Sequence, residues 1–169
     1  MSIPSYKTLK TPIHGLKIHL NKVVADSHGF FCDLAETDNP LWQTKIKHLH
    51  ASIAIKKGVA RGEHYHYRLI ENFYILSGTA LWIFHDFNKK SKTFGKTWSL
   101  VLDFPPKKNK LAQIEIHPYI YHAFWPLTNE KVVAFATGTT GYDPTDYKKL
   151  NIAEVPAVVR ILKKYKIKI

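Results

Sequence analysis

Two histidines and a glutamate lie near the middle of the chain, in a spacing that suits metal binding. His64 and His66 are two residues apart, and Glu71 follows five residues later. Because residues i and i+2 of a β-strand face the same side, both imidazoles can point into one cavity, and Glu71 can join them if the chain bends after Tyr67. Imidazole and carboxylate ligands suit Zn, Fe, Mn, Ni or Co. The spacing therefore predicts a divalent-metal site, and we expect no organic cofactor.

This stretch resembles the first signature of the cupin superfamily: glycine, five residues, His-x-His, four residues, glutamate, six residues, glycine. Every fixed position is filled within residues 58–78. Residues 116–124 resemble the second signature, which supplies one more histidine, here His122. They depart from it at Tyr119, where the signature usually has a glycine. We therefore expect that the conformation of this turn can differ, although His122 stands at the position of the signature's histidine. The resemblance implies that His122 is the fourth ligand, inside an antiparallel jelly-roll β-barrel.

The composition indicates one globular domain spanning residues 1–169. The chain is 45% hydrophobic and 13% aromatic, which favours a packed core over disorder. No apolar run approaches the roughly 20 residues of a membrane span, and the first residues lack the apolar core of a signal peptide. The single cysteine, Cys32, suits a reducing compartment. We therefore expect a cytoplasmic protein with no membrane partner.

The net charge of +12 implies an anionic partner. The basic residues are spread along most of the chain, and we find no nucleic-acid-binding module, so nucleic acid is not the expected partner. A small molecule that carries a diphosphate is the more economical candidate.

Short segments of alternating apolar and polar residues follow one another at regular intervals, which predicts a mostly β domain. Gly78 follows an apolar run and predicts a hairpin turn. Residues 1–12 are expected to form an N-terminal arm. The C-terminal extension, residues 145–169, differs: a short helical turn is expected at 144–150, and 155–162 suit either helix or strand. The predicted strands span residues 16–24, 30–34, 45–56, 79–85, 96–102, 111–117 and 131–137.

The order of motifs along residues 16–146 resembles that of the dTDP-4-dehydrorhamnose 3,5-epimerase family. The resemblance implies an isomerase that removes a proton next to the ketone of a nucleotide-diphosphate-linked deoxysugar and returns a proton to the opposite face. It also implies a homodimer that serves deoxysugar or polysaccharide biosynthesis. The matching segments are Gly15-Leu16, Asp26-x-His28-Gly29-x-Phe31, Gly58-Val-x-Arg61-Gly62-x-His64-Tyr65, Ser91-x-Thr93-Phe94-Gly95, Ile116-x-Pro-x-x-x-His122-x-Phe124 and Thr139-Thr140-x-Tyr142.

The resemblance also assigns roles to residues. His64 matches the general base, and a neutral imidazole suits that task because its pKa lies near working pH. Arg61 matches an arginine that holds the diphosphate through its planar set of donors. Glu154 is the expected carboxylate that orients the base, and Tyr142 is the expected proton donor. Further residues expected at the substrate are His28, His50 and Tyr121, the last also as an alternative proton donor.

Two positions depart from the family's pattern. Its lysine, which stabilises the enolate oxygen, falls on Glu71, and its tyrosine proton donor falls near Thr137. The position after His-Tyr, usually glutamine, is His66. These changes install metal ligands, and a metal ion could replace the lysine as a Lewis acid. Because a metal-bound imidazole cannot also abstract a proton, His64 is either base or ligand.

Three functions stay open at this point. The first is the isomerase. The second is a metal-dependent cupin enzyme of another class, an oxygenase or a phosphosugar isomerase. The third is a catalytically idle cupin that binds sugar nucleotides, which the missing lysine and tyrosine would suit. We favour the isomerase because the resemblance runs through the whole chain and the basic charge suits a diphosphate.

Overall fold

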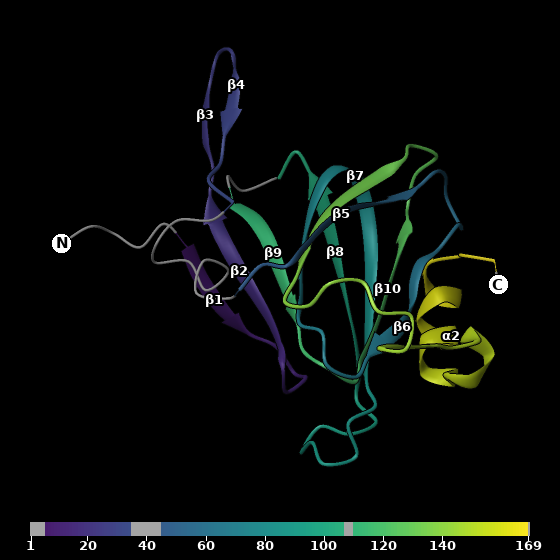
Figure 1. The fold of residues 1–169 in the computed structure, drawn as a ribbon. Coiled ribbons are helices and arrows are strands. Elements are labelled where there is room, and N and C mark those ends of the chain that lie inside the picture. Colours follow the sequence, from purple (N-terminus) through teal and green to yellow (C-terminus); the bar gives the residue numbers. More distant parts are fainter. Residues whose placement is uncertain (1–5, 35–44, 107–109, 169) are drawn as a thin grey trace.

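Two antiparallel β-sheets packed face to face form the body of the protein in this computed structural model, which describes residues 6–34, 45–106 and 110–168 (Figure 1). The predicted mostly β jelly-roll is confirmed. Of the predicted N-terminal arm, residues 1–5 lie outside the described residues, and residues 6–10 are not an arm but a strand that pairs within the first sheet. The strands are β1 (Tyr6–Lys10), β2 (Leu16–Lys22), β3 (Val24–Asp26), β4 (Gly29–Phe31), β5 (His48–Ala54), β6 (Arg61–His66), β7 (Glu71–Asp86), β8 (Thr97–Phe104), β9 (Lys110–Ile116), β10 (Ile120–Pro126), β11 (Val132–Gly138) and β12 (Tyr147–Lys149). A 3-10 helix, η1 (Ile152–Glu154), and helix α2 (Pro156–Lys164) follow.

Strand β7 belongs to both sheets. Its first half pairs with β9 and β11, and its second half pairs with β8 and β10. One sheet therefore has the order β1-β2-β9-β7-β11-β5, and the other has the order β8-β7-β10-β6-β12. The predicted hairpin turn at Gly78 is wrong, because Gly78 lies inside β7 with a φ of 76°. A Cβ there would come within 2.8 Å of the Lys131 carbonyl oxygen, so only glycine lets the strand bend from one sheet into the other.

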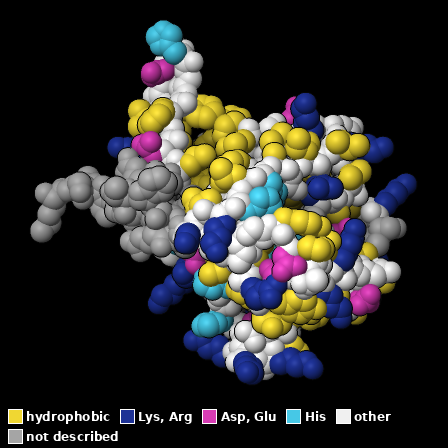
Figure 2. Space-filling view, in the orientation of Figure 1, with side chains coloured by type: hydrophobic (Ala, Val, Ile, Leu, Met, Phe, Trp, Pro, Cys, Tyr) yellow, Lys and Arg dark blue, Asp and Glu magenta, His cyan; other side chains and the backbone are white. Residues whose placement is uncertain are grey.

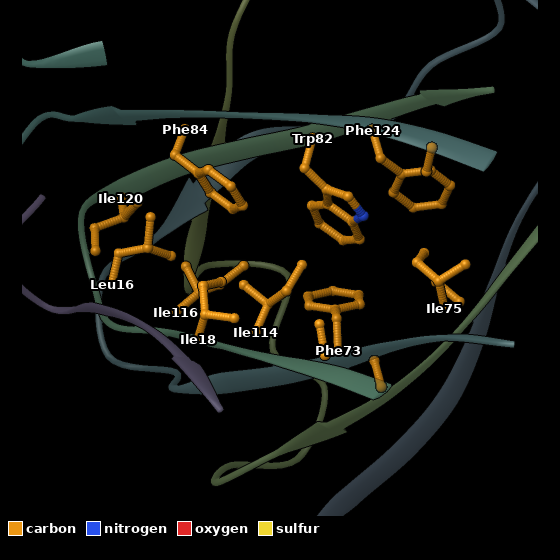
Figure 3. Packing of buried hydrophobic residues seen from close by; sticks show 14 of the residues in the cluster. Leu16, Ile18, Phe73, Ile75, Trp82, Phe84, Ile114, Ile116, Ile120 and Phe124 are labelled. Carbon is orange, nitrogen blue, oxygen red and sulfur yellow. The ribbon is translucent and has the colours of Figure 1, made fainter. Parts of the chain in front are cut away.

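The hydrophobic core lies between the two sheets. Trp82 and Phe124 from one sheet face Phe73 and Ile75 from the other (Figure 3). The rings of Phe73 and Trp82 are tilted, with centroids 5.1 Å apart. The alternation along each strand explains this packing, because every second side chain points between the sheets. The three aromatic side chains Phe73, Trp82 and Phe124 also line the cavity described below. The packing of the core therefore fixes part of the cavity wall.

Helix α2 covers the outer face of the second sheet. Its side chains Val158 and Leu162 are fully buried in a cluster with Leu81 and Trp125. Pro156 stands in the first turn, where its fixed φ suits a helix start and its missing N–H costs nothing. The ambiguous segment 155–162 is therefore helical.

The segment before α2 differs from its prediction. Residues 144–150 were expected to form a helical turn, but β12 lies there and pairs with β6, with Tyr147 opposite His66 and Lys149 opposite His64. The local sequence does not indicate this pairing, because the partner strand β6 lies about eighty residues earlier in the chain. Long-range pairing therefore overrides the local preference.

A hairpin of β3 and β4 projects from the body (Figure 1). Hydrophobic side chains gather beside the base of this hairpin, and Lys and Arg side chains are spread over the rest of the same face (Figure 2). On this face, the positive charge is therefore distributed rather than gathered in one patch. None of the helices in the described ranges is long and apolar enough to cross a membrane.

Candidate active site

The four predicted metal ligands meet in one cavity. His64 and His66 come from β6, Glu71 begins β7, and His122 lies on β10 directly opposite His64. Their ligand atoms all lie within 4.8 Å of one another. Glu71 Oε2 is 3.1 Å from His122 Nε2 and 3.2 Å from His66 Nε2. The geometry thus brings together all four residues that the sequence singled out.

Hydrogen bonds on the outer side of the cluster determine which imidazole nitrogens face Glu71. His64 and His122 each donate Nδ1–H to the backbone carbonyl two residues before it, at 3.1 Å. Because a carbonyl oxygen can only accept a hydrogen bond, Nδ1 carries the proton. In a neutral ring, Nε2 then carries the lone pair. Three inward-facing atoms are buried without a hydrogen-bond partner among the described residues: His66 Nε2, His122 Nε2 and Glu71 Oε2. A cation between them would satisfy all three.

Burial and neighbouring charges set the protonation of the cluster. Burial, reinforced by the nearby His122 ring, lowers the pKa of His64 to about 3. Burial raises the pKa of Glu71, but the adjacent His122 and His66 rings outweigh it and hold that pKa below its ordinary value. The cluster therefore offers a neutral imidazole and an ionised carboxylate, the forms that bind metal ions.

The cavity has a volume of about 450 Å³, a size typical of small-molecule sites. Arg61 and Lys149 line it and can attract an anionic ligand. Strand β5 contributes His48 and His50, whose rings stack with centroids 4.9 Å apart. Tyr142 also lines the cavity and is 73% exposed, which places it at the mouth.

Three predicted site residues lie outside this cavity. Tyr121 is 0% exposed, because it neighbours His122 on β10 and so faces the opposite side of the strand, in the cluster beneath α2. His28 lies in the turn between β3 and β4, with its side chain 93% exposed. Glu154 caps η1, where its Oε1 accepts from Asn151 N at 3.4 Å. Two predictions are therefore wrong: Tyr121 does not face the cavity, and Glu154 caps η1 instead of orienting His64. His28 lies outside the cavity of its own chain, and its contact with the substrate stays a prediction.

Sequence reasoning missed the cavity residues that surround β12. Asp146 is 3% exposed, with Oδ2 3.6 Å from His66 Nδ1. The ring of Tyr147 lies 5.5 Å from that of His64. A strand prediction for residues 147–149 would have placed Tyr147 and Lys149 on one face. No local signal marks Asp146, because its contact with His66 depends on how the loop folds.

The turn before His122 keeps the backbone of a glycine although it holds Tyr119. The φ of Tyr119 is 64°, a left-handed conformation that costs a non-glycine residue roughly 1 kcal/mol. Its N–H donates to the His66 carbonyl at 2.7 Å, and its own carbonyl accepts from Phe87 N at 2.9 Å. These bonds offset the cost and tie β6 to the start of β10. The turn is therefore not reshaped.

Comparison with known families gives one match. The family model described as dTDP-4-dehydrorhamnose 3,5-epimerase matches residues 10–162, which is most of the chain. None of the curated proteins compared with the chain matches it.

Several solved structures resemble the fold. NovW, a 4-keto-6-deoxy sugar epimerase from Streptomyces spheroides, is 18% identical, covering 86% of this chain and 74% of its own, with a TM-score of 0.75. A dTDP-6-deoxy-D-glucose-3,5-epimerase from Legionella pneumophila, solved with dTDP-4-keto-L-rhamnose, is 22% identical, covering 86% and 78%, with a TM-score of 0.74. A dTDP-4-dehydrorhamnose 3,5-epimerase from Sulfolobus tokodaii is 23% identical, covering 88% and 84%, with a TM-score of 0.73. At these identities the likeness concerns the fold.

Proposed function

This chain belongs to the dTDP-4-dehydrorhamnose 3,5-epimerase family, and from this membership we propose that it is an isomerase that epimerises a nucleotide-diphosphate-linked keto-deoxysugar in deoxysugar or polysaccharide biosynthesis. The observation that carries the proposal is the cavity, which combines an imidazole cluster with cations. Arg61 is exposed beside it, and its planar guanidinium suits the oxygens of a diphosphate. The sugar would then extend toward the histidines.

We further propose that His64, His66, Glu71 and His122 hold a divalent ion of Zn, Fe, Mn, Ni or Co. An ion about 2.1 Å from each ligand atom places adjacent ligand atoms roughly 3.0–3.4 Å apart. The two distances from Glu71 Oε2 to imidazole nitrogens, 3.1 and 3.2 Å, fit that spacing. When bound, such an ion supplies a Lewis acid that polarises the ketone. Glu71 alone would repel the negative charge that develops on that oxygen.

Two further polar residues of the cavity, His50 and Tyr142, are proposed to act on the sugar. If His64 is a ligand, it cannot also be the base, so we propose that the neutral imidazole of His50 accepts the proton removed next to the ketone. His50, on β5, lies with Nε2 4.0 Å from Glu71 Oε1 and lines the cavity, which supports its proposed contact with the substrate. The neighbouring phenol of Tyr147 raises the pKa of Tyr142. Tyr142 therefore stays protonated and remains our proposed proton donor.

Deuterium exchange tests the proposed reaction. With a dTDP-linked 4-keto-6-deoxyhexose in heavy water, we expect the protein to incorporate deuterium at carbons next to the ketone, measured by NMR. Arg61→Ala should raise KM about 10–100-fold, the effect of losing charge-assisted bonds worth roughly 1.5–3 kcal/mol. Lys57→Ala, at an exposed position outside the cavity lining, is the control and should leave KM unchanged.

The two alternative functions predict other results. Tight binding of the nucleotide sugar without exchange would indicate a catalytically idle binding protein. Bound metal with no response to nucleotide sugars would instead indicate a cupin enzyme of another class, an oxygenase or a phosphosugar isomerase.

We also propose that the enzyme works as a homodimer in the cytoplasm. The projecting hairpin exposes apolar side chains: Val24 is 55%, Phe30 46% and Phe31 63% exposed. Apolar groups gathered on an exposed element favour a protein partner, and the single thiol of Cys32 suits a reducing compartment. Light scattering should give twice the chain mass of 19.5 kDa, and a monomer mass at micromolar concentration would contradict the dimer.

A further inference from the structure

Asp146 stands directly behind one of the proposed metal ligands. Its carboxylate is 3% exposed, and Oδ2 lies 3.6 Å from His66 Nδ1, the nitrogen that points away from Glu71. The His66 Nδ1 atom is buried and makes no hydrogen bond among the described residues. A small rotation of the ring would bring this nitrogen within hydrogen-bond distance of the carboxylate.

The other two imidazoles show what this contact would do. His64 and His122 each have Nδ1 held by a backbone carbonyl, which fixes the ring and turns Nε2 into the cluster. His66 has no such carbonyl contact among the described residues, and Asp146 occupies the equivalent place. All three rings therefore have an acceptor behind Nδ1, and only the acceptor behind His66 is a charged side chain. A carboxylate in this place both fixes a ligating imidazole and raises its basicity.

The carboxylate of Asp146 is itself held in place by a backbone N–H and by the side chain of Arg68. Asp146 Oδ2 accepts from Leu69 N at 3.1 Å, and Oδ1 accepts from Arg68 Nε at 3.1 Å. Arg68 also donates to Asp143 Oδ2 at 2.6 Å. Because Arg68 is shared between Asp146 and Asp143, it offsets part of the negative charge that Asp146 brings next to His66.

We propose that Asp146 is a positioning residue that holds the Nδ1–H of His66 and thereby aims Nε2 at the metal ion. The inference rests on the metal site proposed above. It gives Asp146 a task beyond joining its own loop to the segment between β6 and β7, because the task is to favour one tautomer and one orientation of a ligand. It also replaces Glu154 with Asp146 as the carboxylate that orients a histidine, and it moves the oriented histidine from His64 to His66.

Cobalt titration tests the proposal, because Co²⁺ suits the same ligands and reports its coordination by visible absorbance. We expect Asp146→Ala to bind Co²⁺ about 10–100-fold more weakly, the usual cost of losing an outer partner of a metal-bound histidine, with an altered spectrum. Asp146→Asn keeps an oxygen acceptor and should recover part of the affinity. Thr145→Ala is the matched control, because it removes a hydrogen bond to Asp143 in the same loop without touching the Asp146 carboxylate or His66, and should stay within about threefold of the parent.

Melting in EDTA separates the structural contribution of Asp146 from its effect on the ligand. Asp146→Ala and Thr145→Ala should both melt below the parent, but only the first should lose cobalt affinity. If Asp146→Ala does not fold, Asp146→Asn carries the test, with a loss of about tenfold. Equal affinity in parent and Asp146 variants, or an equal loss in Thr145→Ala, would overturn the role of Asp146 alone. A parent that binds no cobalt would overturn the metal site and this role together.

Discussion

His66→Ala protein should lose its divalent metal ion. His66 supplies one of four ligand atoms and one of the two imidazole nitrogens within 3.2 Å of Glu71 Oε2. Removing an outer partner of a ligand already costs about 10–100-fold in metal affinity, so removing the ligand should cost on the order of 100-fold or more. Elemental analysis of protein purified without a histidine tag should find about one metal ion per chain in the parent and little in the variant.

A second histidine variant serves as the control. His28→Ala removes an imidazole that is almost fully exposed at the tip of the hairpin, so its metal content should equal that of the parent. Melting curves in EDTA should show that both variants remain folded. A parent that stays without metal after equilibration with Zn²⁺, Mn²⁺, Ni²⁺ and Co²⁺ would leave the cluster as a hydrogen-bonded pocket, and the Lewis acid would drop out of the proposed reaction.

The cluster of candidate metal ligands was predictable because the positions of two of its members follow from local geometry. The period of two along a strand places His64 and His66 on one face, whatever the rest of the chain does. The prediction of His122 required the second motif, because His122 reaches the other ligands only through the pairing of β10 with β6. Tyr121 shows the limit of such reasoning: the same period that points His122 inward points its neighbour out of the cavity.

The errors arose where distant residues decide the local structure. Gly78 has the sequence context of a hairpin turn, but the Lys131 carbonyl packs against it and β7 continues through it. Residues 147–149 form a strand only because β6 offers them an edge. Asp146 was missed for the same reason, since its position follows from the pairing of the next residue, Tyr147, with His66. Single-sequence patterns carry no information about such partners.

Gly62→Ala should destabilise the protein strongly and disturb the cluster. Gly62 lies on β6 with a φ of 92°, and an added Cβ would come 2.7 Å from the His122 carbonyl oxygen and 3.1 Å from the Ala123 Cα. The left-handed backbone costs roughly 1–2 kcal/mol and the overpacking roughly 1–3 kcal/mol. Together they should lower the free energy of unfolding by about 3 kcal/mol. For a chain of this size, that lowers the melting temperature by roughly 6–12 °C.

Gly58→Ala separates the two causes of this loss. Gly58 has a similar φ of 82°, but an added Cβ there would meet nothing within 4 Å, so the variant keeps the strain and lacks the close contact. The free energy of unfolding of Gly58→Ala should fall by only about 1–2 kcal/mol, and its metal affinity should equal that of the parent. Gly62→Ala should also bind metal more weakly, because relieving the contact moves β6 away from β10 and separates His64 from His122. If Gly62→Ala matched Gly58→Ala in both melting temperature and metal affinity, the close approach of the two strands would not be what sets the spacing of these ligands.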